Sequence, residues 1–419
     1  MEEIGGSGAH ATGRAFILFP AGSRTLDETM TLHLSRFRLL LALAACLGAA
    51  RLPGVELDPI GPGSFAVGST NLEVTDPAGN PMIDYLNGKL AGGKEAYLTD
   101  ILANPTAVLT LTIDVPNQSA TFGAQAGGRL PVVIYVLYPT RNDNPRADYR
   151  FPYSETGDAV FPHMQKPGEP PIFAAATTQY PLIVYSGGYN THGLWHLAHL
   201  KNLAAHGYIV VDVFHGDART TGFNAALALR PIELRAALDR VLQDPGFSGA
   251  IDRDRIGASG ASAGGHTILS AMGGFDPADP PSSRPDPRIK AGFGLVPFMG
   301  GSFGSWPFQM DVWLFGRDHA GLRGVRTPFF AIYAQNDRNV PPGNVEAGLR
   351  ELGGPTTAVL LDGETHDLSA KATSDDDTWE ILFFDAWLRG DADACRKLAE
   401  GTTVKGGVHD HKTYEREAH

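Results

Sequence analysis

The sequence has little cysteine and a modest supply of positive charge. Its 419 residues include 2 cysteines, Cys46 and Cys395, which excludes a disulfide-rich scaffold. Lys and Arg number 34 against 46 Asp and Glu, for a formal net charge of −12. A chain with this balance offers no basic stripe for a phosphate backbone, so nucleic acid is not expected as a partner.

The rest of the composition is that of a globular protein. Hydrophobic residues make up 43% and charged residues 19% of the chain, enough to bury a core, while 50 Gly and 30 Pro predict many turns between short elements. The length fits one large domain with additions.

The N-terminal region has the order of features that targeting requires. From Met30, Arg36 and Arg38 precede the apolar run Leu39 to Cys46, which is too short to span a bilayer. We interpret residues 30–50 as a signal peptide and residues 1–29 as an extension from a start codon assigned too early. The expected location is therefore secreted or periplasmic.

Two cleavage patterns compete in this leader. Gly48-Ala49-Ala50 suits simple secretion, the favoured interpretation, whereas Leu43-Ala44-Ala45-Cys46 resembles a lipoprotein box. Lipidation of Cys46 is the only membrane attachment that we expect. Simple secretion would leave Cys395 alone, with no intramolecular disulfide.

Short strand-like runs alternate with helical patterns through the remainder. We expect strands and an insertion in 51–129, one α/β domain in 130–395 and a loose polar tail in 396–419. The alternation predicts a doubly wound, mostly parallel sheet with helices on both faces. The apolar runs expected as strands are 65–68, 72–74, 108–115, 132–136, 182–185, 209–213, 329–334 and 359–361; the expected helices are 194–206, 231–242, 263–272, 344–352 and one capped by Ser374 to Asp377 that ends at Gly390.

The segment Gly260-Ala261-Ser262-Ala263-Gly264 joins a strand-like run to a helical pattern. This is the context of a nucleophile elbow, where glycines flank a serine held in a strained turn. Ser262 is the candidate nucleophile, and the Ala263 N–H at the start of the helix is a candidate oxyanion donor.

Candidate partners follow the nucleophile in the order that this arrangement requires. Asp337 and His366 each lie just beyond a late strand-like run, on loops that should meet at the carboxyl edge of the sheet. The rival acids Asp362, Glu364 and Asp367 are near His366 in sequence but less able to reach its far ring nitrogen.

A second oxyanion donor is expected in Ser186-Gly187-Gly188-Tyr189, after an early strand. We assign it to the Tyr189 N–H, with Gly188 as the alternative. The aromatic stretch 299–315, with Trp306 and Trp313 as candidate substrate contacts, forms either a lid over an apolar substrate or part of the core.

Three other features receive structural interpretations. His192, His196 and His199 are expected on a surface or partly packed helix face, because no H-E-x-x-H pattern accompanies them. His215 to Asp217 should shape the rim of the site. We assign no metal site; the pair His409 and His411 is too small a set.

Several segments together resemble bacterial dienelactone-hydrolase-like serine esterases, which are also similar to platelet-activating-factor acetylhydrolases. The resemblance spans about residues 130–390. Its motifs are Tyr180 to Gly188, Leu203 to Val210, Arg230 to Asp239, and Ile251 to Gly257 leading into the elbow. It implies an α/β-hydrolase fold and serine-type ester hydrolysis.

The chain also departs from each of these groups. Dienelactone hydrolases proper use cysteine where this chain has Ser262. The acetylhydrolases carry their acid where Lys290 to Gly300 has no carboxylate.

The expected function is therefore a serine carboxylic-ester hydrolase that uses Ser262, His366 and Asp337 on a small or polymeric ester, without a metal or organic cofactor. The alternatives are a lipase or phospholipid acetylhydrolase, a secreted polyester hydrolase, and a catalytically silent envelope binding protein.

Overall fold

The chain divides into two units, Met1–Leu41 and Ala42–His419, and the second holds every residue that can be described. A computed structural model describes residues 54–70, 110–150, 160–165, 169–175, 178–191, 196–220, 222–275, 285–304, 307 and 309–416. The predicted extension and signal peptide, including Cys46, lie outside these residues, as does Trp306. In the ranges searched, none of the helices has the length and hydropathy needed to cross a membrane.

The fold is mixed α/β and is built on a large sheet with the order β17-β15-β14-β11-β10-β8-β9-β4-β2-β7, in which β3 also pairs with β4. The stretch from β15 to β9 is parallel throughout, and β4 and β17 run antiparallel at its two ends. The strands are β2 (Ala66–Thr70), β3 (Thr110–Asp114), β4 (Arg129–Thr140), β7 (Met164–Gln165), β8 (Tyr180–Ser186), β9 (Ile209–Phe214), β10 (Ile251–Ala261), β11 (Ile289–Leu295), β14 (Phe329–Ala334), β15 (Thr356–Leu361) and β17 (Asp410–Arg416).

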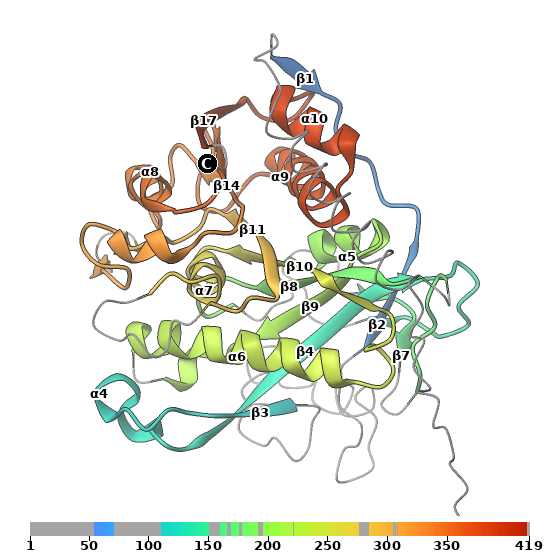
Figure 1. Cartoon of the computed structure of the whole chain (residues 1–419), viewed down its shortest axis with the longest axis horizontal. Helices are drawn as coiled ribbons and strands as arrows, with labels where there is room; N and C mark the ends of the chain where they lie inside the picture. The colour runs from blue at the N-terminus through green and yellow to red at the C-terminus, as the bar shows by residue number, and fades with distance from the viewer. Residues whose placement is uncertain are drawn as a thin grey trace, which may run out of the picture. The chain divides into compact units, whose positions relative to one another are not determined.

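Helices cover both faces of this sheet (Figure 1). One face packs on α5 (Leu197–Ala205), α9 (Ala370–Phe384) and α10 (Ala392–Glu400), and the other packs on α4 (Ser119–Phe122), α6 (Phe223–Gln243), α7 (Ala263–Ala271) and α8 (Pro342–Glu351). Strand β4 shows the division, because Val133 and Tyr135 join one core cluster and Val132 and Ile134 the other. Burial on two faces explains why the central strands are continuous apolar runs.

Small pairings lie outside the main sheet. Strand β1 (Val55–Leu57) pairs in parallel with β16 (Gly401–Val404), β5 (Tyr149–Arg150) with β6 (Val160–Phe161), and β12 (Gly301–Phe303) with β13 (Met310–Val312).

The sequence patterns locate most of these elements. The runs expected at 132–136, 182–185, 209–213, 329–334 and 359–361 all fall in strands of the sheet, and the run at 108–115 contains β3. Residues 72–74 lie outside the described ranges.

The predicted helix start at Pro231 is wrong. Helix α6 begins eight residues earlier, at Phe223, and Pro231 lies in its interior. The preceding residues include Ala225, Ala226 and Leu227, which are good helix formers and buried. Their packing offsets the hydrogen bond that proline removes.

The predicted cap of the last long helix is also wrong. Helix α9 begins at Ala370, where the Ser369 side chain accepts a hydrogen bond from the Ala372 N–H. Asp375 and Asp376 are therefore buried residues within the helix. The predicted stop is correct, because Gly390 ends the helical turn Asp385–Arg389 in the left-handed conformation.

The C-terminal segment is not a loose tail. Strand β17 pairs antiparallel with β15 and covers that edge of the sheet. The Nε1 of Trp379, a fully buried residue, donates to the Asp410 carboxylate at 2.7 Å and ties the start of this strand to α9. Cys395 is also buried, in α10.

We predict that Trp379→Phe lowers the free energy of unfolding by about 1–3 kcal/mol, because it removes a buried hydrogen bond to a carboxylate. Urea denaturation followed by tryptophan fluorescence and circular dichroism measures this change. Trp313→Phe is the matched control, since the buried Trp313 Nε1 has no hydrogen-bond partner within the described ranges. Equal losses in the two variants would show that the contact to Asp410 contributes nothing.

Candidate active site

Strand β8 has β9 on one side and β10 on the other. The chain leaves β8 through α5 toward β9 on one side, and it leaves β10 through α7 toward β11 on the other side. The winding of the sheet therefore changes direction between β8 and β10. In open α/β sheets the crevice at such a point, outside the carboxyl ends of the strands, is where ligands bind. The loop from Gly187 to Asn190 and the turn at Ser262 both lie there.

Ser262 occupies the turn between β10 and α7 with φ 54° and ψ −117°, a strained conformation for a residue with a side chain. Glycine is needed at the flanking positions because neighbouring backbone atoms lie too close for a side chain to fit. A Cβ on Gly264 would lie 1.8 Å from the Ser186 carbonyl oxygen, and one on Gly260 would lie 2.5 Å from the Gly264 backbone. The Ser262 carbonyl accepts hydrogen bonds from the Gly265 and Phe298 N–H groups, each at 2.9 Å, which fixes the turn.

The structure brings the three predicted residues together. His366 Nε2 lies 3.0 Å from the Ser262 Oγ, and His366 Nδ1 lies 2.7 Å from the Asp337 Oδ2. The other carboxylate oxygen of Asp337 accepts the N–H groups of Asn339 and Val340, each at 2.8 Å. These backbone donors keep the buried carboxylate directed at the imidazole.

The rival acids have other partners or positions. Asp362 Oδ2 pairs with His409 Nδ1 at 2.6 Å. The Glu364 side chain accepts hydrogen bonds from the backbone and hydroxyl of Ser369. Asp367 borders the cavity beside His366, but the carboxylate bonded to His366 belongs to Asp337.

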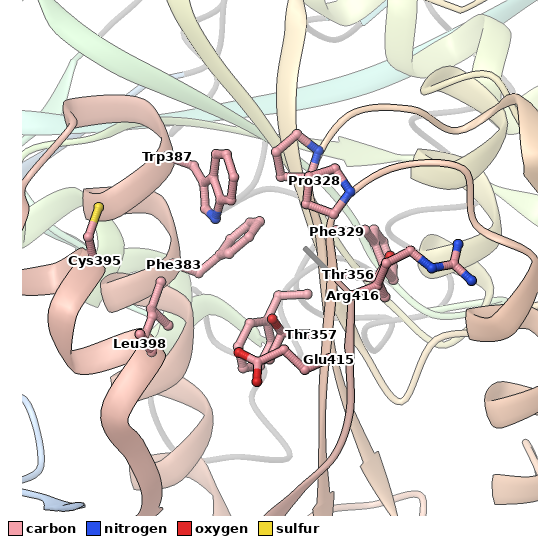
Figure 2. Close-up of a pocket in the computed structure, with 13 residues that line it drawn as sticks. Pro328, Phe329, Thr356, Thr357, Phe383, Trp387, Cys395, Leu398, Glu415 and Arg416 are labelled. Carbon is pink, nitrogen blue, oxygen red and sulfur yellow. The ribbon is translucent and has the colours of Figure 1, made fainter. Parts of the chain in front are cut away.

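A cavity of about 630 Å³ opens in front of Ser262 and His366, within the range of small-molecule sites. Its apolar lining includes Leu295, Val296, Phe303 and Leu368, and Gly188 and Tyr189 border the serine side. A separate cavity of about 70 Å³ lies between the β14–β15–β17 end of the sheet and helices α9 and α10 (Figure 2). That space is too small for an ordinary organic ligand.

Arg230, which is 1% exposed, is hydrogen-bonded to the loop that carries Gly188 and Tyr189. Its two terminal nitrogens donate to the Gly187 and Gly188 carbonyls, each at 2.7 Å. In a trans peptide the N–H points opposite to the preceding C=O. With the Gly188 carbonyl directed at Arg230, the Tyr189 N–H must face the other way.

Asp217 completes this support. Its carboxylate accepts from the Arg230 guanidinium at 2.6 and 2.8 Å and from the Asn190 N–H at 2.6 Å. Gly188 lies close to the serine, because a Cβ built on it would be 3.7 Å from the Ser262 Cβ. Arg230 was not among the candidate residues, and its only signal in the sequence was its place in the Arg230 to Asp239 motif.

A second Ser–His–acid set lies beneath the same loop. His215 contacts the Ser186 Oγ at 2.8 Å and the Glu233 carboxylate at 2.6 Å, and all three residues are buried. They are not among the residues that line the cavity. Burial and the nearby Arg230 charge lower the pKa of His215. His215 and Asp217 therefore support the loop from inside, rather than shaping an exposed rim.

The aromatic stretch 299–315 serves two roles. Phe303 borders the cavity and packs on Phe223 and Tyr189, with ring centroids at 4.5 and 6.4 Å. Phe315 is core and stacks on His266. Trp313 packs near His319 and Arg317 and is not one of the residues that line the cavity.

The prediction that the histidines lie on a surface or partly packed helix face is wrong for His199. This residue is buried, and it lines the cavity together with His196 and Asp376. Burial disfavours its charged form, but the carboxylates of Glu380 and Asp376 more than offset this and raise the pKa of His199 well above its usual value. Burial lowers the pKa of His196 to about 3, so that imidazole is neutral near pH 7. His192 lies outside the described residues.

Comparison with known proteins adds no relative to this description. No protein-family model matches the chain, and no curated protein matches its sequence. The geometry around Ser262 is therefore the basis for assigning a function.

Proposed function

We propose that the chain is a serine hydrolase that cleaves carboxylic esters, with the α/β-hydrolase fold that the resemblance implies. The observation that carries this proposal is the continuous hydrogen-bonded series Ser262–His366–Asp337, with contacts of 3.0 and 2.7 Å. It opens onto a cavity with a largely apolar lining. The strained turn at Ser262 and its place after a central strand support the same fold.

In the proposed reaction, His366 Nε2 takes the Ser262 proton as the Oγ attacks the ester carbonyl carbon. The carbonyl π bond becomes an oxyanion, which the Ala263 and Tyr189 N–H groups stabilise. When the tetrahedral intermediate collapses, the C–O bond to the alcohol breaks and His366 gives that alcohol its proton. Water then attacks the acyl-enzyme by the same route and releases the acid and Ser262. Asp337 holds the imidazole in the required tautomer.

The lining favours esters with an apolar acyl group. Phe303, Leu368 and Val296 border the space in front of the serine, and Tyr189 supplies an aromatic edge. Phospholipid acetyl esters and polyesters stay as alternatives within the same chemistry, and a panel of acyl lengths ranks them. Secretion or periplasmic export, with or without lipidation at Cys46, stays a prediction from the leader.

Replacing the nucleophile tests the proposal directly. Ser262→Ala should lower turnover of short p-nitrophenyl esters by about 10⁶-fold and abolish labelling by a fluorophosphonate probe. Ser186→Ala is the contrasting variant, because Ser186 belongs to the buried second set and is 0% exposed, so it should keep probe labelling. Full activity or labelling in Ser262→Ala would refute the assignment.

The support beneath the oxyanion loop gives a second test. Arg230→Lys keeps a positive charge but loses the planar fork that holds both carbonyls. We expect kcat to fall about 10²- to 10³-fold with little change in KM, because a misplaced Tyr189 N–H weakens stabilisation of the oxyanion alone. Arg240→Lys, on the same helix and paired with Asp244, is the control. Equal effects of both variants on kcat would show that Arg230 does not position the loop.

The pH dependence of stability gives a third test. Burial, with His199 and His366 nearby, lowers the pKa of His196 to about 3. The contribution of His196 to stability is therefore complete above its unfolded pKa of about 6.5 and is lost as the pH falls toward 3. Urea denaturation followed by circular dichroism at each pH measures this loss. A free energy of unfolding that does not fall between about pH 6.5 and about pH 3 would contradict it.

A further inference from the structure

Helices α5 and α9 pack against each other on one face of the sheet, and a group of ionisable side chains lies between them. His199 comes from α5, and Asp376, Asp377 and Glu380 come from α9. Except for Asp377, which is partly buried, these side chains are more than nine-tenths buried. His199 and Asp376 also line the cavity in front of Ser262, so the group can be reached from that cavity.

The contacts in this group resemble a metal site with its supporting residues in place. His199 Nδ1 lies 2.6 Å from the Asp377 Oδ1 and 3.6 Å from the Asp376 Oδ2. The other ring nitrogen faces the Glu380 carboxylate at 2.5 Å. A carboxylate beside the second ring nitrogen is common at metal-bound histidines, where it orients the ring so that the first nitrogen faces the ion. The second oxygen of Asp377 is held by the Asn202 amide at 2.9 Å.

The charges in this group do not balance. His199 can supply one positive charge against three carboxylates, and within the described ranges the ion pairs of these carboxylates are with His199. The Oδ1 of Asp376 and both carboxylate oxygens of Glu380 are buried with no hydrogen-bond partner among the described residues. Buried carboxylate oxygens without donors are costly. Protonation relieves part of that cost, since burial raises the pKa of Asp376, and a bound cation is the other way to relieve it.

We propose that His199, Asp376 and Asp377 bind a divalent transition-metal ion, with Zn²⁺ as the preferred ion. Their donor atoms lie within 4.8 Å of one another, and the contacts of 2.6 and 3.6 Å are within reach of one ion with bonds of about 2.1 Å. Mixed imidazole and carboxylate donors suit Zn²⁺ better than Ca²⁺, which prefers six to eight oxygens. Three protein ligands leave a coordination position for water on the cavity side.

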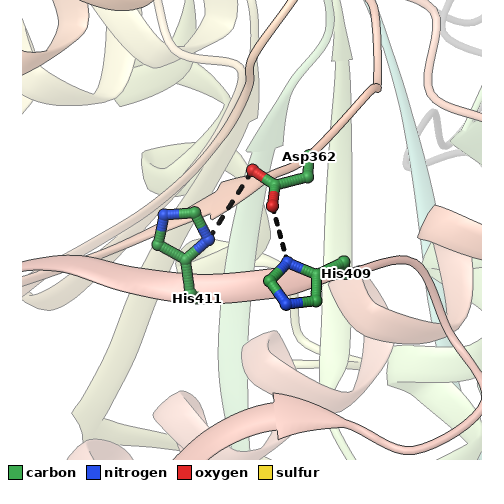
Figure 3. A group of neighbouring side chains, drawn as sticks. All are labelled: Asp362, His409 and His411. Atoms are coloured by element: carbon green, nitrogen blue, oxygen red, sulfur yellow. Dashed lines mark hydrogen bonds and ion pairs between the residues drawn. The ribbon is translucent and has the colours of Figure 1, made fainter.

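A second group, Asp362, His409 and His411, has a similar set of donors (Figure 3). It lies at the protein surface, where the side chains of His409 and His411 are 77% and 44% exposed. Water reaches both rings, although the Nδ1 of His411 is itself buried without a hydrogen-bond partner among the described residues. One carboxylate faces two imidazoles, so the charge balance does not require an ion. We use this group as the internal control.

The test uses the full chain, treated with a chelator, dialysed and titrated with ZnCl₂ by calorimetry, with bound metal measured by mass spectrometry. We expect one tightly bound Zn²⁺ per chain and a higher unfolding temperature in its presence. Asp376→Asn should abolish tight binding. Glu380→Gln should weaken it about 10- to 100-fold. Asp362→Asn should leave it unchanged.

Unfolding temperatures distinguish a metal site from a purely structural ion-pair network. Without metal, Asp376→Asn should be as stable as the wild type or more so, because it removes an unbalanced buried charge; with Zn²⁺ the wild type should be the more stable. An Asp376→Asn variant that is less stable under both conditions, no tight site in the wild type, or loss of binding in Asp362→Asn would overturn the proposal. Ser262→Ala should bind Zn²⁺ like the wild type, so this test is independent of the proposed ester hydrolysis.

Discussion

Between β10 and α7 the chain turns from strand to helix at Ser262, and the close packing at that turn constrains everything around it. A side chain on Gly264 would overlap the Ser186 carbonyl at the end of β8. The first turn of α7 is therefore in contact with the end of β8, which also pairs with β10 at Gly260 and Ser186. This contact brings the end of β8 near the serine, so one steric requirement places the candidate nucleophile and the candidate oxyanion loop together.

The other partners reach the same place through the register of the parallel strands. Strands β14 and β15 pair without a register shift, so the loops after them leave the same edge as β10. Asp337 and His366 lie on these loops, a few residues beyond the strand ends. Short connections and backbone donors to the Asp337 carboxylate then limit how far the imidazole can move. Pre-organisation of this kind lowers the entropic cost of reaching the reactive geometry.

Sequence patterns located these features because each is local. The glycines of the elbow, the apolar runs and the loop positions of Asp337 and His366 can be read within a few residues of one another. Arg230 and His199 could not be found in this way, because their partners lie 13 to 181 residues away along the chain. The start of α6 was missed for a related reason, since tertiary packing carries that helix through Pro231.

Two buried polar groups lie beside the residues of the cavity, and charged groups of this kind are costly to remove from water. Arg230 with Asp217 lies under the loop after β8, and His199 with its carboxylates lies between α5 and α9. Replacing buried ion pairs by apolar residues is often neutral or stabilising, so such groups are poor evidence of a stabilising role. The two apolar faces of the sheet already provide an extensive core. Both groups lie beside the residues around Ser262 and not at the distant edges of the sheet. Positioning of the backbone and binding of a ligand therefore explain these groups better than a contribution to stability does.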